Sequence, residues 1–481
     1  MAIAIFRNIT VEPVLFLYML CVFMSFPLVQ QLAFQKICNA EYDAESCKNL
    51  TTSQENFVHK KTSKWILYQS VSSMLPSIAA SLILGSWSDK VGRKTVLILP
   101  SVGSVLLYIN YMLNVGFFSL SVDYLLIGVC ISGFFGGFAT TLLGVFSYIS
   151  DITDESQRTT RVALLESMIF LGGTVGNLIG GVLVYHSGYM AAFGLCLGLN
   201  VLIIAYVGLI LPESYFPDSN QQENWALVAI HNHIKTSFHV LTKERPQHRR
   251  LNLLVIMFGI LVFVLINFGG FNDISVLYSK HSPRNFTSEL VGYFFAEVLF
   301  IKGLGVMLGI PLMTKILKWS DLTIAIVGSL ISIGQYVFLG FASSRWMMFV
   351  GGLIAIGAGV TPPCMRSMIS KQVDSSEQGT TFALVASLEV LETLLASLIF
   401  NSIYSATVDW LPGFCYFLMS GMTVIPILLL IWLYVLERQS NPYVVMSSSP
   451  DVDGSLNNEE AFAKSSGQLE YGSSKDVKDV L

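Results

Sequence analysis

The chain alternates long apolar runs with shorter polar segments over most of its length. A membrane-spanning helix needs about 20 mostly apolar residues, and twelve runs meet this requirement. We predict spans at 11–33, 65–86, 96–116, 121–148, 162–186, 190–211, 250–277, 290–314, 322–342, 346–368, 380–404 and 411–435. The pattern therefore predicts an all-α membrane protein with twelve transmembrane helices.

The longest polar interruption between spans, 212–249, divides the helices into six and six. We expect an N-terminal half at 1–211, a cytoplasmic central loop at 212–249, a C-terminal half at 250–435 and a tail at 436–481. The tail is rich in serine and acidic residues, a composition typical of disorder. Two six-helix halves joined by a central loop are typical of the major facilitator fold.

Composition supports the membrane assignment and excludes other classes. Charged residues make up 12% of the chain and apolar residues 53%, about half the charge of an ordinary soluble domain. The net charge of −4, with no basic stripe, argues against a nucleic-acid partner. We find no metal-ligand spacing, phosphate-binding loop or nucleophile elbow in a suitable context, so no metal, cofactor or enzymatic activity is expected.

Lys and Arg in short loops predict the orientation, because they concentrate on the cytoplasmic side. The loops after even-numbered spans carry Lys90, Arg93, Lys94, Arg158, Arg161, Lys315, Lys318, Arg366 and Lys371, in addition to the central cluster. These loops and both termini are expected inside. The first loop opposes this rule with Lys36, Lys48, Lys60, Lys61 and Lys64.

Two other features place the first loop outside. Asn49-Leu50-Thr51 and Asn285-Phe286-Thr287 match the glycosylation acceptor pattern, and their loops fall on the same predicted side. Cys38 and Cys47 flank a short polar segment there, where a disulfide would persist. A bridge and two unpaired thiols are both open at this stage.

The tail contains Tyr443-Val-Val-Met446, a tyrosine followed by a bulky apolar residue three positions on. Such a pattern can bind a sorting adaptor and direct a protein to endosomes or lysosomes. It also occurs by chance.

The segment GSWSDKVGRK lies between the second and third spans. It fits G-x-x-x-D-[KR]-x-G-R-[KR] through Gly85, Asp89, Lys90, Gly92, Arg93 and Lys94. Gly85 would allow close helix approach and Gly92 a tight turn. This motif resembles the loop signature of the major facilitator superfamily, which implies a gating latch on the cytoplasmic side.

Longer strings resemble solute carrier family 46, which includes the proton-coupled folate transporter. They are SKWILYQSVSSMLPSIAASLILGSWSDKVGRK, RVALLES, RSMISKQVDSSEQGTTFA and FNSIYSATVDWLPGF. The C-terminal half looks closest to the lysosomal member 3 branch. Helix 2 and RVALLES look at least as similar to the folate transporter.

Charged residues within spans are costly and are functional candidates. The resemblance implies proton coupling for Glu166 and substrate or proton binding for Arg366. Alternatively, Glu166 pairs with Arg161 or Arg158 at the interface, and Arg366 is an ordinary positive-inside residue. The resemblance also implies a transport role for Asp151, which could instead organise its loop with Arg158.

Further candidates lie in the C-terminal half. Glu389 and Glu392 are three residues apart and share a helical face. Glu389 matches a Glu of the member 3 branch and is a second candidate for proton coupling. Glu392 and Lys302 are candidates for substrate binding, and we expect one of the two glutamates to pair with Lys302. Asn267, also a substrate-binding candidate, stands where the folate transporter has a His, and Leu126 falls near a position where it has an Arg.

These features predict a proton-coupled symporter that moves organic anions, such as steroid conjugates or bile acids, from the lysosome to the cytosol. Its partners would be a small anion, protons and the bilayer. A plasma-membrane folate or antifolate transporter is one alternative, although the departures at Asn267 and Leu126 weaken it. A non-transporting membrane receptor or scaffold is the other.

Overall fold

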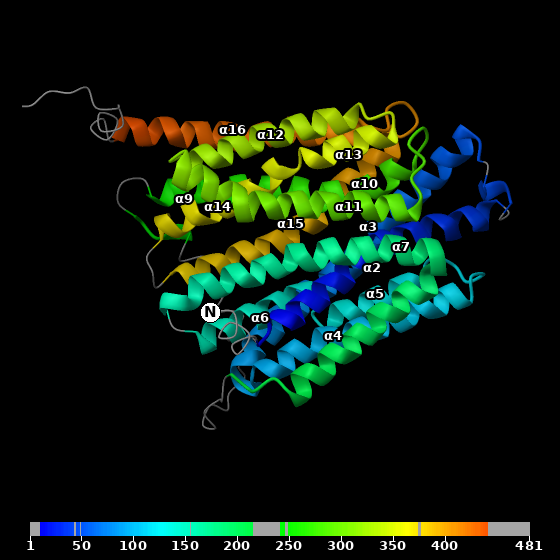
Figure 1. The fold of residues 1–481 in the computed structure, drawn as a ribbon, viewed down its shortest axis with the longest axis horizontal. Coiled ribbons are helices and arrows are strands. Elements are labelled where there is room, and N and C mark those ends of the chain that lie inside the picture. Colours follow the sequence, from blue (N-terminus) through cyan, green and yellow to red (C-terminus); the bar gives the residue numbers. More distant parts are fainter. Residues whose placement is uncertain are drawn as a thin grey trace, which may run out of the picture. The chain divides into compact units, whose positions relative to one another are not determined.

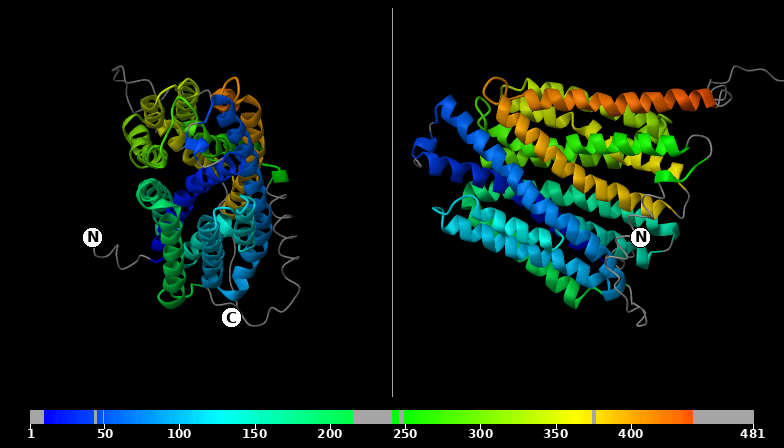
Figure 2. Two further views of the ribbon diagram at one scale, coloured as in Figure 1. Left: turned by 90° about the vertical axis from the view of Figure 1, so that its right-hand side faces the viewer. Right: turned by 180° about the vertical axis from the view of Figure 1, so that it is seen from behind.

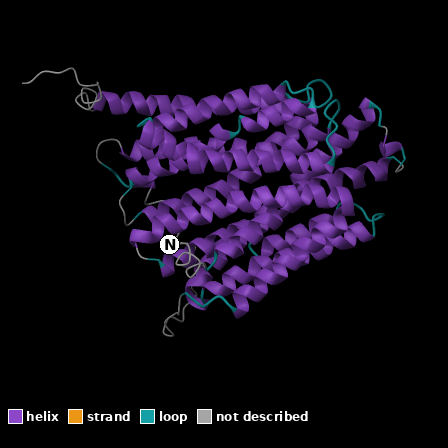
Figure 3. Cartoon of the chain, in the orientation of Figure 1, coloured by secondary structure: helices purple, strands orange, loops and turns teal. Residues whose placement is uncertain are grey.

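The structure is a computed structural model, which describes residues 10–42, 45–48, 50–153, 155–214, 241–245, 249–373 and 377–440. Every regular element in these ranges is a helix, and no strand occurs among them (Figure 3). Residues up to Leu433 form one compact unit. A second unit begins at Tyr434, and its described residues continue the last helix to Ser440.

The N-terminal half holds the first six spans. Its elements are α2 (Glu12–Glu41), η1 (Ser46–Lys48), α3 (Thr52–Val91), α4 (Arg93–Gly116), α5 (Tyr124–Phe134), α6 (Gly137–Ile152) and α7 (Glu155–Leu209). The fourth span is interrupted between α5 and α6 at Gly136, whose φ of 89° suits a residue without a Cβ. The fifth and sixth spans are both within α7 and meet at Gly188, where the backbone leaves the helical conformation.

The C-terminal half begins at α9 (Arg249–Val264), which continues through the π-helical η2 (Leu265–Gly270) into α10 (Phe271–Lys280). The remaining elements are α11 (Ser288–Leu304), η3 (Gly305–Gly309), η4 (Leu312–Ile316), α12 (Asp321–Gly340), α13 (Arg345–Leu353), α14 (Ile356–Gln372), α15 (Gln378–Thr407) and α16 (Phe414–Ser440). The long helices lie lengthwise beside one another (Figure 1).

The predicted all-helical fold is confirmed. Ten helical stretches in the described chain are long and apolar enough to cross a membrane, and one of these, Leu164–Leu209, contains two of the predicted spans. The second span lies within α3, which is not among the ten. Serines and Gln69 reduce the apolar character of this helix.

The structure corrects the extent of α3. The sequence predicted a span at 65–86 with polar loops on both sides, but the helix begins at Thr52 and ends at Val91. Much of the first polar loop and most of the GSWSDKVGRK segment are therefore helical. Gly92 alone separates α3 from α4, and its φ of 100° provides the turn.

The halves pack together through two helix pairs, α7 with α11 and α3 with α15. Seen end-on in the left view of Figure 2, the yellow-green helices lie on one side and the teal helices on the other, and blue helices reach both groups. At the α7–α11 contact, a Cβ added to Gly181 would lie 2.8 Å from the Cα of Gly292. This contact therefore depends on glycine, as close helix approach in membranes commonly does.

Candidate transport site

The centre of the candidate site is an ion pair between two helices of the C-terminal half. Arg366, on α14, donates from Nη2 to Oε1 of Glu389, on α15, at 2.5 Å. The two side chains are 34% and 21% exposed, so both are partly accessible to solvent in this conformation. An ion pair that solvent reaches can exchange its partners, as substrate binding requires.

Glu166 brings the N-terminal half into the same cluster. This residue of α7 interacts electrostatically with both Arg366 and Glu389. The alternative partner suggested by the sequence, Arg161, instead forms an ion pair from Nη2 to Oε1 of Glu12 on α2, with the two atoms 2.8 Å apart. The other suggested partner, Arg158, has a side chain outside the described ones. The fold thus brings together Glu166, Arg366 and Glu389 from both halves.

Glu392 lies one turn beyond Glu389 on α15, and it interacts electrostatically with Glu389 and Arg366. It is buried, and neither of its carboxylate oxygens has a hydrogen-bond partner within the described chain. An ionised carboxylate in such a position would be costly. We refer to Glu166, Arg366, Glu389 and Glu392 as the central charge cluster.

Lys302 and Asn267 lie elsewhere. The Lys302 ammonium sits 5.2 Å from the ring centroid of Phe271. Glu389 pairs with Arg366, and Glu392 accepts no hydrogen bond from a described residue, so the expected pairing with Lys302 is not found at Glu392. Asn267, in η2, accepts a 2.6 Å hydrogen bond from the Tyr336 hydroxyl and donates to the Phe263 carbonyl, which joins helices within the C-terminal half.

Asp151 bonds to Arg93 of the GSWSDKVGRK motif, so its contacts differ from those of Glu166. Its Oδ2 accepts hydrogen bonds from Nε of Arg93 at 2.8 Å and from the Ser214 hydroxyl at 3.2 Å. Of the two roles suggested by the sequence, this geometry favours organisation of the loop, with Arg93 as the observed partner. The role of Asp151 in proton coupling stays a prediction.

Glu213 completes this contact. Its carboxylate accepts the backbone N–H of Arg93 at 2.7 Å and that of Lys94 at 3.3 Å, which satisfies the first turn of α4. A Cβ on Gly92 would lie 2.6 Å from Oε2 of Glu213, so glycine is required here both for space and for its φ. Gly85, Asp89 and Lys90 lie within α3, and their side chains are not among the described ones.

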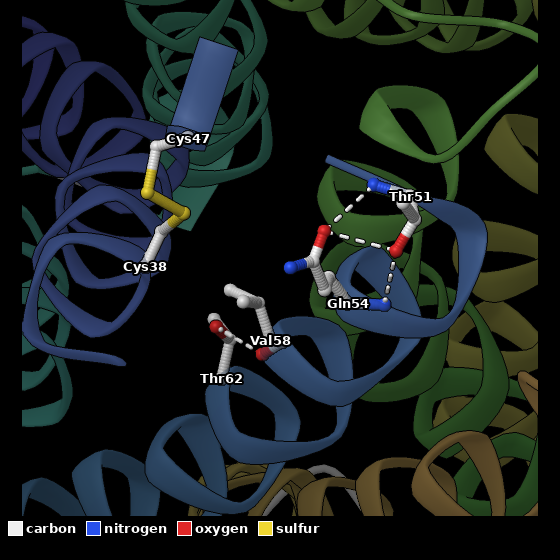
Figure 4. Close-up of a disulfide and its surroundings, with 6 residues drawn as sticks. All are labelled: Cys38, Cys47, Thr51, Gln54, Val58 and Thr62. Carbon is white, nitrogen blue, oxygen red and sulfur yellow. Dashed lines mark hydrogen bonds between the residues drawn. A yellow bond between two sulfur atoms is a disulfide. The ribbon is translucent and has the colours of Figure 1, made fainter. Parts of the chain in front are cut away.

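At the opposite end, Cys38 and Cys47 form a disulfide that links α2 to η1 (Figure 4). Just before the first residue of α3, the Thr51 hydroxyl donates to the Gln54 side-chain oxygen and accepts the Gln54 backbone N–H (Figure 4). Asn285 is exposed, as a glycosylation acceptor must be. Asn49 lies outside the described residues, and so do Tyr443 and Met446. We call the end that carries the disulfide the outer end.

Sequence reasoning missed two histidines at the outer end. His59, on α3 before the predicted span, is fully buried, and its ring lies 5.0 Å from that of His281 and packs on Phe34 and Tyr404. The Glu55 carboxylate is 3.7 Å from its Nε2. The hydropathy pattern gave no reason to single out His59, because residues 52–64 were expected to be a polar loop.

Burial lowers the pKa of His59 from 6.5 to about 4, although Glu55 acts in the opposite direction and His281 and Arg284 add to the lowering. Because the folded pKa is depressed, the unfolded chain binds more protons between these values. The contribution of the neutral His59 ring to the free energy of unfolding is fully present above pH 6.5, and it is lost as the pH falls towards 4. When the pH is lowered from 7 to 4.5, we expect the free energy of unfolding of His59→Phe to fall by about 1–3 kcal/mol less than that of the wild type.

Thermal unfolding in detergent at both pH values would measure this difference. His186→Phe is the matched control, because His186 is exposed and should leave the pH response unchanged. An equal pH response in His59→Phe and the wild type would contradict the prediction.

A bundle of two six-helix halves with ionised residues at their interface is the architecture of a secondary transporter. The family profile of the Major Facilitator Superfamily matches residues 13–397. The chain is 31% identical to the chicken "Lysosomal proton-coupled steroid conjugate and bile acid symporter SLC46A3", and the alignment covers 89% of this chain and 94% of that protein. It is also 31% identical to the rat "Proton-coupled folate transporter", with 93% and 96% covered.

Solved structures show the same fold. The human organic anion transporter MFSD10 (TETRAN) superposes with a TM-score of 0.60 at 17% identity, covering 87% of this chain and 97% of that one. A POT family transporter in complex with 5-aminolevulinic acid gives 0.62 at 12% identity, covering 89% and 96%. The chain therefore belongs to the Major Facilitator Superfamily and, within it, to solute carrier family 46. It is a multi-pass membrane protein of a transporter family.

Proposed function

We propose that this protein is a proton-coupled symporter of amphipathic organic anions, such as steroid conjugates or bile acids, and that it moves them from the lysosomal lumen to the cytosol. The observation that carries the proposal is the pairing of Arg366 with Glu389 beside Glu166. It places one cation and several carboxyl groups at the junction of the halves. The named activities of the chicken and rat relatives support this assignment.

The cluster suggests how anion and proton are coupled. An anionic substrate that binds Arg366 must displace Glu389, and the displaced carboxylate would then lie near a second anion. Protonation of Glu389 or Glu166 removes that repulsion, so anion and proton bind together. Glu392, buried without a described hydrogen-bond partner, is expected to hold a proton throughout. We therefore assign it to the proton side of the site rather than to direct substrate contact.

Asn267 is relevant to the choice of substrate. Its amide is hydrogen-bonded to Tyr336 and Phe263, and it does not titrate. Proton coupling in this chain would therefore depend on carboxyl groups, several of which the central charge cluster supplies. This supports the steroid-conjugate and bile-acid class over the folate alternative, whose transporter has a titratable His at this position.

Uptake into proteoliposomes under an imposed proton gradient tests the proposal. We expect a labelled steroid sulfate or bile acid to accumulate when the outer-end compartment is acidic, and accumulation to collapse when a protonophore removes the gradient. Accumulation of folate alone would favour the folate alternative. No uptake of any of the three by correctly folded protein would favour a receptor or scaffold.

The lysosomal location is part of the proposal and is tested separately. A tagged chain is expected to co-localise with lysosomal markers, and Tyr443→Ala should move part of it to the plasma membrane if the tail binds a sorting adaptor. An unchanged distribution would exclude that role for Tyr443 and Met446.

A further inference from the structure

A second buried carboxyl group lies nearer the outer end than the central charge cluster. Asp273, on α10, is 5% exposed, and its Oδ2 accepts a 2.7 Å hydrogen bond from Nδ2 of Asn401 on α15. Asn401 is fully buried and also donates to Ser397. A carboxyl group within a membrane span is a functional candidate, and the transport site described above does not use this one.

Asn401 connects this carboxyl group to the other half of the molecule. Ser63, on α3, donates to the backbone carbonyl of Asn401 at 2.7 Å and lies 3.1 Å from its side-chain oxygen. One turn inward on α15, Ser397 donates to Ser70 of α3 at 2.8 Å. The surroundings of Asp273 are thus part of the contact that holds α15 against α3.

More contacts close the same end. Asn56 hydrogen-bonds His281, Glu55 accepts the backbone N–H of Ser282, and Lys60 pairs with Asp409. Together with the Ser63–Asn401 and Ser70–Ser397 bonds, they join the two halves from the outer loops into the membrane. We call this set of contacts the outer gate, and it is closed in this structure.

The hydrogen-bond donor to Asp273 in the described part of the chain, the Asn401 amide, is neutral. Charged groups on the neighbouring helices have other contacts. Lys280 donates to Gln31, Lys302 lies over Phe271, and His59 faces Glu55 and His281. Tyr404 on α15 packs against His59, Lys60 pairs with Asp409, and Tyr416 hydrogen-bonds Ser275 of α10. Arg284 bonds to backbone carbonyls and lies over the ring of Tyr278, also on α10. With these partners, burial of Asp273 costs less when the carboxyl group is protonated.

A polar stripe on α15 leads from Asp273 to the central charge cluster. Asn401, Ser397, Thr393 and Glu389 are each four residues apart, so they lie on one face of the helix. The Asn401 and Thr393 side chains bond back to the positions four residues before them. The stripe covers about 18 Å from Asn401 to Glu389 at 1.5 Å per residue. It connects the outer gate with the Arg366–Glu389 pair.

We propose that Asp273 is a proton-binding residue of the outer gate, and that the gate closes over it after it has taken up a proton from the outer side. This inference rests on the proposed symport, to which it adds the site where the proton enters. Protonation neutralises the carboxyl group before α15 and α3 come together, so an unprotonated carrier stays open to the outer side. Closure is thereby linked to the presence of the transported proton.

Distances between spin labels in full-length protein in nanodiscs test this directly. Labels at Lys64 on α3 and Trp410 after α15, both exposed, would report outer opening after Cys130 is replaced by serine. As the pH is lowered from 7.5 to 5, protonation of Asp273 should raise the ratio of closed to open molecules by up to about tenfold per pH unit. Asp273→Asn should lose this contribution and be predominantly closed at both pH values, whereas Asp273→Glu should retain a response with a shifted midpoint.

Ser63→Ala is the matched control. It removes one gate hydrogen bond but keeps the carboxyl group, so it should reduce closure at every pH and leave the pH response intact. A wild-type response in Asp273→Asn would overturn the proposal. So would loss of the response in Asp273→Glu together with Asp273→Asn, because shape rather than protonation would then be responsible. If Asp273→Asn does not fold, an unchanged midpoint in Asp273→Glu overturns it. The readout needs no substrate, so failure of uptake alone bears on the proposed function and not on this inference.

Discussion

Replacing Arg366 by alanine is expected to reduce organic-anion uptake by about 10- to 100-fold, as the loss of a partly buried charge partner would. The guanidinium donates to Glu389 and interacts with Glu166 and Glu392. Without it, three carboxyl groups would face one another with no cation from α14, and the anionic substrate would lose its counter-charge. Initial uptake rates in proteoliposomes, normalised to folded protein, measure the effect.

Lys371→Ala is the matched control on the same helix. Lys371 pairs with Asp321 at 2.6 Å, but its side chain is 64% exposed at the end of α14. An exposed pair contributes little, so uptake should change by less than about twofold. Arg366→Lys keeps the charge but loses the planar guanidinium, and it should give an intermediate rate. Equal losses in Arg366→Ala and Lys371→Ala would contradict a specific role for Arg366.

Glu166→Gln is expected to uncouple transport from protons while leaving substrate binding intact. Proton-driven accumulation should be lost. The part of the pH dependence of uptake that Glu166 contributes, up to about tenfold per pH unit for a one-proton step, should disappear, while any contribution from Asp273 remains. Exchange of internal for external substrate requires no net proton movement and should continue. The measurements are accumulation under a proton gradient and substrate counterflow, made on the same vesicles.

Glu297→Gln provides the comparison for this variant. Glu297 also lies within a membrane span, on α11, but it faces Gly352 of α13 rather than the central charge cluster. Its substitution should leave both the accumulation and its pH dependence unchanged. The role of Glu166 would be rejected if Glu166→Gln kept the pH dependence of the wild type, or if counterflow disappeared together with accumulation.

Much of the architecture could be predicted because it depends on local chemistry. Twenty apolar residues in succession specify a span wherever they occur, and the breaks at 212–249 and Gly92 are visible in the polar pattern. The ends of α3 were misjudged for the same reason. Residues 52–64 are polar, yet they are helical because His59 and Asn56 pack against the opposite half. A hydropathy pattern does not detect such a contact.

Candidate residues were easier to find than their partners. Glu166, Arg366 and Glu389 were identified by their charge within spans and by resemblance to a family. Asp273 was visible in the same way but suggested no role, because its partner Asn401 is 128 residues away. Lys302 was expected to pair with a glutamate, and the contact that the structure describes for its ammonium is with the ring of Phe271. Sequence distance says nothing about which of several charges meet.

The sequence by itself determined that this protein is a twelve-helix membrane protein with a charged, glycine-containing motif between its second and third spans. Those features follow from hydropathy, glycine and charge at nearby positions. Only the tertiary structure decided that Glu166 meets the Arg366–Glu389 pair, that Asp151 bonds to Arg93, and that Asp273 bonds to Asn401 beside the contact of α15 with α3. These are contacts between helices far apart in the chain, and packing alone selects them, because a charge buried in a membrane is stable only where the fold supplies its partner.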